Sequence, residues 1–346
     1  MTATLTTAPR FGVWAPVYGT WGARTHPVEV PDASYRRTRD LIVRAEELGF
    51  DSTLVAQHVL HPGGAEHDVL ETWSTLAGLA EATSRVELIG AIKPLLFNPL
   101  VFAKTVANIE QIASDRVAIN LVSGWFLPEL EAIGLGDVTH GDRYEYSREW
   151  LDVVGRLWRG DAIESALDGA VAAGAQLRPA LDRTPRVYLG GESEAARALA
   201  AAQADVFFLN GRPPEDVADI IDDMRRRERN KPQPLQFGLS AFVITRETAE
   251  EAQREFEYLQ GLVDGSGQRD RTVGADPATA MFKVHEGVAR VGTNGGTLAG
   301  LIGSYDQVAE RIRVFADLGI DLFMLQFQPL EAEMERFATH ILPLFR

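Results

Sequence analysis

The residues best suited to chemistry gather around one apolar run in the middle of the chain. Residues 116–122 form a run of strand length, rich in β-branched side chains, that is broken by Ser123 and Gly124. Asn120 lies inside this run and Glu129 follows shortly after it. In a parallel α/β protein the loops at the carboxyl ends of the strands form the reactive face. We therefore expect these side chains where a ligand would lie.

A second group of residues is suited to binding an anion. Gly191, Glu192 and Ser193 follow an expected strand at 186–189 and open a helix. That arrangement presents free backbone amides and the positive end of the helix dipole to a phosphate. Arg143, in the preceding loop, would add charge-assisted hydrogen bonds. A glycine pair at such a turn is frequently only a matter of backbone geometry, so both interpretations stay open.

Histidines offer further possibilities. His58, His61 and His67 crowd the loop after an expected strand at 52–56, where a metal site must be considered. Their spacing on a glycine-rich loop matches no compact ligand motif, so we expect solvated loop residues and no metal. His140 either donates a proton or caps a loop. Because Ser123 does not lie in a G-x-S-x-G pattern and no Asp/His pair is evident, a serine hydrolase is not expected.

Composition narrows the class of protein. The chain has 346 residues, 45% of them hydrophobic and 24% charged, which is typical of a globular enzyme with a large core. A net charge of −15 disfavours nucleic acid and anionic membranes as partners. The absence of cysteine excludes disulfides, thiolate metal sites and a cysteine nucleophile. No signal-peptide pattern and no membrane-spanning apolar segment are evident, so we expect a cytoplasmic protein.

These residues must be positioned by a regular alternation of strands and helices. The pattern gives eight strands, each followed by a helix, and right-handed crossovers close that order into a barrel. The sequence therefore predicts a single α/β domain over 1–346, a (β/α)8 TIM barrel with insertions. Strands are expected at 11–15, 52–56, 86–92, 116–122, 186–189, 206–209, 237–244 and 322–327. Helices are expected at 34–48, 71–83, 99–113, 144–158, 194–203, 214–228 and 249–262, with another ending at 318.

One segment departs from this alternation. Residues 263–302 show no clean period and are rich in Gly, Asp and Thr. A long irregular segment in a barrel more often covers the mouth than not, so we interpret it as an insertion with a mobile lid. A disordered surface loop explains its first half equally well. Ser304 and Gln307 then form a capping-box pattern that restarts a helix.

Several stretches together resemble one family, the bacterial-luciferase-like flavin-dependent monooxygenases. The combination N-L-V-S-G-W, then P-E, then R-Y is most similar to the branch that holds dimethyl-sulfone and alkanesulfonate monooxygenases and the pyrimidine-ring-opening oxygenase. The resemblance covers nearly the whole chain. The matching stretches are FGVWAP at 11–16, GFD at 49–51, LETW at 70–73, AGLA at 77–80, AINLVSGW at 118–125, HGDRY at 140–144, GGES at 190–193 and ILPLF at 341–345.

The resemblance implies a two-component enzyme. Reduced FMN (FMNH2) would bind at the barrel mouth, brought by a separate NAD(P)H-dependent flavin reductase, with O2 as co-substrate. The assembly would be a homodimer or homotetramer. Catalytic roles would fall to Asn120 and His140. Flavin contacts would come from Ala56, Gln57, Asn120, Glu129, Arg143, Tyr144, Gly191, Glu192 and Ser193.

Departures from the family pattern point to the substrate. Ser240 and Phe242 stand where alkanesulfonate monooxygenases carry an Arg and a His for the anionic sulfonate. The resemblance therefore implies a small neutral organic substrate, such as a sulfone. The alternatives are an oxygenase that opens a nitrogen heterocycle, a deazaflavin-dependent oxidoreductase, a non-catalytic flavin-binding relative and a metal-dependent barrel hydrolase. An alanine-rich stretch at 165–175 replaces the hairpin usual in the family.

Overall fold

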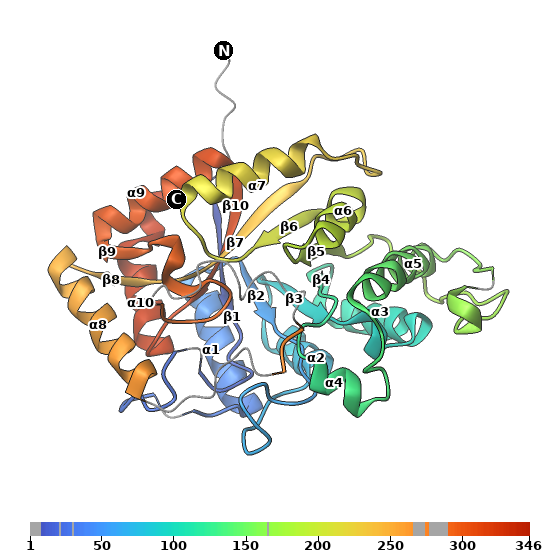
Figure 1. Cartoon of the computed structure of the whole chain (residues 1–346), viewed down its shortest axis with the longest axis horizontal. Coiled ribbons are helices and arrows are strands. Elements are labelled where there is room, and N and C mark those ends of the chain that lie inside the picture. Colours follow the sequence, from blue (N-terminus) through green and yellow to red (C-terminus); the bar gives the residue numbers. More distant parts are fainter. Residues whose placement is uncertain (1–7, 21, 30, 165, 266–273, 277–289) are drawn as a thin grey trace, which may run out of the picture.

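Eight parallel strands close into a barrel in the order β1-β10-β7-β6-β5-β4-β3-β2, which confirms the predicted (β/α)8 TIM barrel. The computed structural model describes residues 8–20, 22–29, 31–164, 166–265, 274–276 and 290–346. Figure 1 shows helices arranged around the barrel. The barrel strands are β1 (Arg10–Trp14), β2 (Ser52–Val55), β3 (Glu87–Ile92), β4 (Val117–Leu121), β5 (Arg186–Gly190), β6 (Val206–Leu209), β7 (Gln236–Phe242) and β10 (Ile320–Gln326).

The helices follow the strands in the predicted alternation, with two short strands added. The α-helices are α1 (Tyr35–Leu48), α2 (Thr72–Ala82), α3 (Pro99–Ala113), α4 (Leu127–Ala132), α5 (His140–Trp158), α6 (Glu194–Gln203), α7 (Pro214–Arg226), α8 (Ala249–Gly265), α9 (Tyr305–Leu318) and α10 (Leu330–His340). Short 3-10 turns lie at η1 (Pro94–Leu96), η2 (Leu167–Gly169), η4 (Gly296–Ala299) and η5 (Leu342–Phe345). Strands β8 (Ile244–Arg246) and β9 (Ile302–Ser304) form a separate two-stranded parallel sheet.

Local caps explain where several helices begin and end. Ser34 caps α1 by accepting from the Arg37 amide, and Gly49 ends that helix with φ of 94°, a conformation that favours glycine. The predicted capping box of Ser304 and Gln307 is confirmed at the start of α9, where each side chain bonds the other residue's backbone. The chain therefore turns from helix to strand where its sequence signals it.

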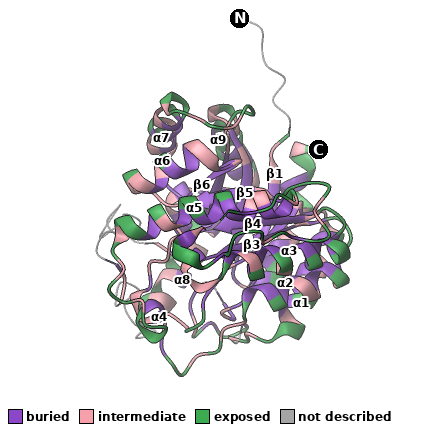
Figure 2. Cartoon of the chain, turned by 90° about the vertical axis from the view of Figure 1, so that its right-hand side faces the viewer, coloured by how far each residue is buried: buried purple, intermediate pink, exposed green. Residues whose placement is uncertain are grey.

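The core has two layers, one outside and one inside the barrel. Outside, the buried faces of the helices pack on the strands, and Figure 2 shows the strands and the inner helix faces buried while the outer faces are exposed. Inside, side chains that alternate along the strands fill the barrel, as expected for a closed eight-stranded sheet. This inner cluster consists of Trp14, Leu54, Ile89, Ala118, Tyr188, Val206, Phe208, Leu322 and Met324.

The structure corrects several predictions of where elements begin and end. The single strand expected at 237–244 is divided, because the chain changes partner: the Val243 amide bonds Gln326 O and the Ile244 amide bonds Leu301 O, both at 3.0 Å. Helix α5 begins at His140, not at 144, because Thr139 acts as its N-cap. Glu129 lies in the short helix α4 and not in a loop.

The region predicted as an insertion with a mobile lid is described only in part. Helix α8 continues to Gly265, past its expected end, while residues 266–273 and 277–289 lie outside the described residues. The stretch at 274–276 contacts the loop after β4, and 290–300 contacts the ends of β6 and β10. The alanine-rich stretch forms η2 and one bridge, Ala166 with Val171. Within the described residues, none of the helices is both long and apolar enough to cross a membrane.

Candidate active site

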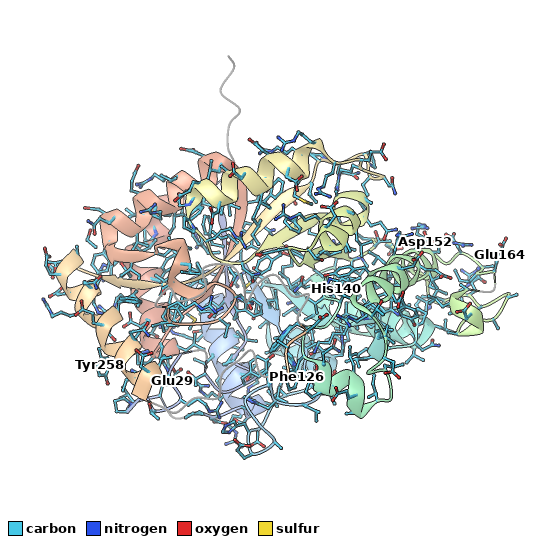
Figure 3. The ribbon with its side chains drawn as sticks, viewed as in Figure 1. Glu29, Phe126, His140, Asp152, Glu164 and Tyr258 are labelled. Atoms are coloured by element: carbon cyan, nitrogen blue, oxygen red, sulfur yellow. The ribbon has the colours of Figure 1, made fainter. Side chains whose placement is uncertain are left out.

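The predicted site residues meet at the carboxyl end of the barrel. Gln57 directly follows β2, Asn120 lies in the last part of β4, and Gly191 to Ser193 follow β5. The register of the sheet sets Asn120 opposite Ala91 of β3 and Tyr188 of β5. His140 lies near the centre of the view in Figure 3, at the inner end of α5, whereas Asp152 lies farther out on the same helix.

A fully enclosed charge cluster lies at the ends of β2 and β3. Glu129 Oε1 accepts from His58 Nδ1 at 3.0 Å and from the Val59 amide at 2.6 Å, and its other oxygen pairs with Lys93 Nζ. The side chains of Lys93 and Glu129 are only 3% and 1% exposed. Gln57 Oε1 accepts from the Lys93 amide at 2.5 Å. The cluster therefore joins the loop after β2, the end of β3 and α4.

The protonation states in this cluster follow from burial and neighbouring charge. Burial, with the charge of Lys93, lowers the pKa of His58 to about 4 despite the Glu129 carboxylate. Burial opposes ionisation of Glu129, but the His58 hydrogen bond and the Lys93 charge outweigh it and hold its pKa at about 2. An ionised carboxylate only accepts hydrogen bonds, so neutral His58 carries its hydrogen on Nδ1. Its Nε2 is then the proton-accepting atom.

Two expectations change here. The prediction of solvated loop histidines is wrong for His58, which is buried and packs against Tyr18, Trp125 and Phe126. Sequence reasoning also missed Lys93. Its signal was positional, because it directly follows β3 at the reactive end of the barrel, as Gln57 follows β2. The role of Glu129 as a direct flavin contact stays a prediction, and its carboxylate oxygens are already bonded within the protein.

A second polar cluster joins α5 to the amino terminus of α6. Arg143 Nη2 pairs with Asp276 Oδ2, and His140 Nδ1 lies 3.0 Å from that same oxygen. His140 Nε2 lies 3.2 Å from Ser193 Oγ, the N-cap of α6. The Tyr144 hydroxyl hydrogen-bonds with Ser123 and Ser193, and burial raises its pKa. Arg143 and the helix amino terminus therefore lie together, as the sequence predicted, and His140 joins them; binding of an anion here stays a prediction.

Ser193, His140 and Asp276 stand in the order of a hydrolase triad, yet the surroundings do not suit a nucleophile. Ser193 Oγ already accepts the Ala196 amide at 3.3 Å as a helix cap. The Asp276 carboxylate is neutralised by Arg143 and so cannot act mainly on the imidazole. The arrangement is better suited to holding an anion than to attacking a carbonyl.

The motif at 191–193 suggested that Glu192 lies at an anion site, but its side chain contacts two other side chains of the protein. Its Oε1 pairs with Arg212 Nη2 and accepts from Asn210 Nδ2 at 2.9 Å, so it links the loops after β5 and β6. Its Oε2 is buried with no hydrogen-bond partner among the described residues. Any flavin contact from this residue would come from its backbone amide or from that second oxygen.

Asn120 shows the clearest need for a ligand. Its Oδ1 is buried inside the barrel mouth and has no hydrogen-bond partner among the described residues. Unsatisfied buried acceptors are rare and costly. A Cβ on neighbouring Gly190 would lie 4.0 Å from this oxygen, so the glycine leaves that side of it without a side chain. The ring N–H groups of a reduced flavin are donors that would satisfy it, and the anion site described above suits the flavin phosphate.

At the same end of the barrel, a neutral polar chain links β1, β7 and β10. Ser240 Oγ accepts from Trp14 Nε1 at 3.2 Å and from Gln326 Nε2 at 3.4 Å. Gln326 also bonds the backbone of Thr293, which fixes the segment that follows 290 against β10. Phe242 is fully buried. Neither Ser240 nor Phe242, the two positions that the sequence singled out, offers a charge to a substrate.

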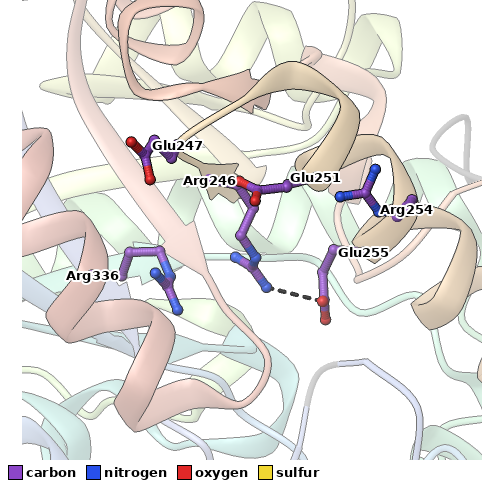
Figure 4. A pocket seen from close by; sticks show the side chains of 6 residues that line it. All are labelled: Arg246, Glu247, Glu251, Arg254, Glu255 and Arg336. Carbon is purple, nitrogen blue, oxygen red and sulfur yellow. Dashed lines mark ion pairs between the residues drawn. The ribbon is translucent and has the colours of Figure 1, made fainter.

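A separate hollow of about 470 Å³ lies away from the mouth, between α8, the end of β8 and α10 (Figure 4). Its central Arg246 is neutralised by Glu255 at 3.1 Å and Glu333 at 2.6 Å. This hollow is open and charge-paired, and it contains none of the predicted site residues. Within the described ranges, no group of three or more His, Asp or Glu side chains is arranged to hold a metal ion.

Comparisons with known proteins find relatives that match nearly the whole chain. An FMNH(2)-dependent dimethylsulfone monooxygenase of Pseudomonas fluorescens (strain Pf0-1) is 30% identical over 98% of this chain and 95% of its own. Another of that name, from Pseudomonas putida, is 32% identical over 89% of this chain and 87% of its own. A crystal structure of a long-chain alkane monooxygenase matches 98% of this chain and 91% of its own at a TM-score of 0.78 and 18% identity, which shows a common fold.

The match extends to a family model. Residues 10–322 fit the model described as luciferase-like monooxygenase. That span begins at β1 and reaches into β10, so it includes both polar clusters of the mouth. The family resemblance noted in the sequence is confirmed, and this chain belongs to the luciferase-like monooxygenase family.

Proposed function

We propose that this protein is a monooxygenase that uses reduced FMN and O2 to oxidise a small neutral organosulfur compound, with a sulfone such as dimethyl sulfone as the first candidate. The observation that carries the proposal is the unpaired Asn120 oxygen beside the cluster of Arg143, His140 and Ser193. One end of that arrangement suits a ring with N–H donors and the other suits a phosphate. The names of the two Pseudomonas relatives support the same cofactor and substrate class.

The protein's task is to hold the flavin and exclude water. Bound reduced FMN supplies the electrons that activate dioxygen for transfer of one oxygen atom. Arg143, His140 and the amides that begin α6 hold the phosphate, and Asn120 orients the ring. His58, kept neutral and oriented by Glu129, provides a proton-accepting nitrogen at Nε2. Trp125 and Phe126 pack against that imidazole and shield it from solvent.

The charges of the mouth favour a neutral substrate. The buried cations Lys93 and Arg212 are each paired with a carboxylate, and the proposal assigns Arg143 to the flavin phosphate. An anionic sulfonate would have to break one of these pairs, at a cost of several kcal/mol. A sulfone of similar size needs only hydrogen-bond donors, and the Ser240 hydroxyl, which accepts from Trp14 and Gln326, has its own hydrogen to donate.

The test compares two substrates of similar size and different charge. Purified protein is loaded anaerobically with reduced FMN and mixed with ¹⁸O₂ and either dimethyl sulfone or methanesulfonate. We expect one ¹⁸O atom in the sulfone product and kcat/KM at least about 100-fold lower for the sulfonate, which corresponds to about 2.7 kcal/mol. Equal use of both compounds would contradict a neutral-substrate site. Oxidation of the flavin at its free rate with no labelled product would contradict the oxygenase assignment.

The same experiment distinguishes the remaining candidates. A nitrogen-heterocycle oxygenase would incorporate ¹⁸O from pyrimidines and not from sulfones, and a deazaflavin enzyme would prefer that cofactor over FMN in equilibrium titration. We further propose that a separate NAD(P)H-dependent reductase supplies the flavin. Activity with chemically reduced FMN, and none with NADH and oxidised FMN alone, is the expected result. Assembly as a homodimer or homotetramer stays a prediction, which light scattering would test.

A further inference from the structure

Asp276 reaches the anion site from a segment far away in sequence. Residues 274–276 form a short antiparallel bridge with the loop after β4: Phe126 pairs with Ala275, the Leu127 amide bonds Gly274 O at 2.9 Å, and the Asp276 amide bonds Trp125 O at 2.7 Å. Gly274 has a φ of 81°, and a Cβ there would lie 3.0 Å from the ring of Phe126. Both features favour glycine and fix the approach of this segment.

The side chain of Asp276 lies on the groups that would hold a phosphate. Its Oδ2 contacts Arg143 Nη2 and, at 3.0 Å, His140 Nδ1. The Arg143 and Asp276 side chains are 2% and 9% exposed, so solvent screens their charges only slightly. Ser193 lies on the other nitrogen of His140, and it caps the helix whose amides face the same site. A carboxylate of the protein thus takes one of the positions that an anionic ligand would take.

We propose that Asp276 is a built-in anion that competes with the cofactor's phosphate for Arg143 and His140, and that it thereby sets how strongly the site selects FMN over an uncharged flavin. The inference rests on the proposed function, which assigns the flavin phosphate to this cluster. Without a ligand, the buried guanidinium of Arg143 would lack a counter-charge, and Asp276 supplies one. When the phosphate binds, two anions share one cation, so the Asp276 charge opposes phosphate binding even though Arg143 Nε offers a donor that Asp276 does not use.

The competition makes a prediction opposite to that of an ordinary supporting residue. If Asp276 only held Arg143 in place, Asp276→Asn would weaken FMN binding. If it competes, the same change removes a like charge beside the phosphate, and FMN binding tightens. Riboflavin carries no phosphate, so its affinity is unchanged in either case. The ratio of the two dissociation constants isolates the phosphate site from the ring site.

The experiment titrates the whole protein with oxidised FMN and with riboflavin, following flavin fluorescence. For Asp276→Asn, and for Asp276→Ala as a second variant, we expect the riboflavin-to-FMN ratio of dissociation constants to rise at least about tenfold, as removal of a close like charge predicts. Asp137→Asn is the matched control, because it removes an exposed carboxylate just before His140. Its ratio should stay within about twofold of the wild type, since exposed charges are screened.

A double variant separates this inference from the proposed function. Arg143→Gln in the Asp276→Asn background removes the cation without leaving an unpaired carboxylate. We expect it to lower the ratio by about 100-fold relative to Asp276→Asn alone, because a buried cation no longer meets the phosphate. If this double variant leaves the ratio unchanged, the phosphate is not at this cluster and the site assignment of the proposed function fails. If Arg143 matters but both Asp276 variants leave the ratio unchanged or lower it, the competition is overturned while the proposed function stands.

Discussion

Charged side chains lie at both ends of the barrel, half-buried at the amino end and buried at the carboxyl end, and they are used differently. At the amino end, Glu87 accepts from Arg10 at 2.9 Å and from the Tyr188 hydroxyl at 2.7 Å, and Arg186 lies 3.5 Å from its other oxygen. Arg10 also donates to the Tyr188 oxygen at 3.1 Å. Burial and the charge of Glu87 raise the pKa of Tyr188 to about 12. Each of these four side chains has its partner inside the protein.

At the carboxyl end, some buried polar atoms lack a hydrogen-bond partner among the described residues. Among the described residues, Asn120 Oδ1, Glu192 Oε2 and Arg143 Nε are buried without a hydrogen-bond partner. Ser52 Oγ and both Glu110 oxygens, toward the amino end, lack a hydrogen-bond partner among the described residues as well, so the contrast is between the paired Glu87 network and the mouth, where three predicted site residues each keep a buried atom without such a partner. We therefore expect the Glu87 network to stabilise the barrel and the unpaired groups of the mouth to accept a ligand.

The largest effect should follow from neutralising the enclosed carboxylate of the mouth. Glu129→Gln keeps the shape but leaves the ammonium of Lys93 unpaired, so we expect a loss of about 3 kcal/mol in the free energy of unfolding. Loss of the fixed orientation of His58 should lower turnover about 10- to 100-fold. Urea denaturation and the labelled-oxygen assay measure the two effects. Unchanged turnover in a destabilised but folded variant would make this cluster purely structural.

A pH titration tests the same cluster more gently. The folded-state pKa of His58 is about 4, below the ordinary value of about 6.5 that applies to the unfolded chain. The unfolded state therefore binds more protons between these values, so stability is present above pH 6.5 and is lost as the pH falls toward 4. From pH 7 to pH 5 this residue should cost about 2 kcal/mol. Urea denaturation of the wild type and His58→Gln should differ by that amount in pH dependence, and equal slopes would contradict a buried neutral histidine.

Replacing Asn120, whose Oδ1 has no hydrogen-bond partner among the described residues, should raise the free energy of unfolding and weaken flavin binding. Asn120→Leu replaces a buried amide of similar size with an apolar group, so we expect a gain of about 1 kcal/mol in the free energy of unfolding. Affinity for FMN and for riboflavin should fall together by about tenfold, because the contact is with the ring. Thermal unfolding and fluorescence titration measure the two. A loss of stability would mean that the Asn120 oxygen is satisfied in the protein without a ligand.

The smallest effect should come from the amino end. Tyr188→Phe removes one hydrogen bond to Glu87 while Arg10 remains, so we expect a loss of about 1 kcal/mol in stability. Flavin affinity should not change, because the amino end lies at the opposite end of the strands from the mouth. An altered riboflavin or FMN dissociation constant would show that the two ends are coupled and would break the contrast drawn between them.

Sequence patterns predicted the bounds of helices and strands better than they predicted which distant segments those elements contact. Helices 99–113 and 194–203 and strand 206–209 have the predicted bounds, because their caps and apolar periods are local signals. The division of the strand expected at 237–244 was not predictable in this way. It depends on Leu301 and Gln326, which are distant in sequence and take over the hydrogen bonds of Val243 and Ile244.

The candidate site shows the same difference between residues that local patterns predict and residues whose contacts depend on distant segments. Asn120, Arg143 and Ser193 were found from their positions at strand and helix ends, and the family resemblance confirmed by the comparisons added the flavin. The sequence predicts a solvated His58 and no role for Lys93, because the burial of a titratable side chain depends on which distant segments pack over it. Asp276 lies in a segment without helix or strand periodicity, so no sequence pattern predicts its contact with Arg143.

The sequence by itself determined the order of strands and helices and the end of the barrel that carries polar residues, because both follow from short-range periodicity and caps. Only the tertiary structure decided which charges meet. Closing the barrel brings Glu129 onto Lys93 and His58, which lie 36 and 71 positions away, and brings Asp276 onto Arg143 across 133 positions. Those pairings depend on register and packing between distant segments, and they decide which buried groups have a partner among the described residues and which do not.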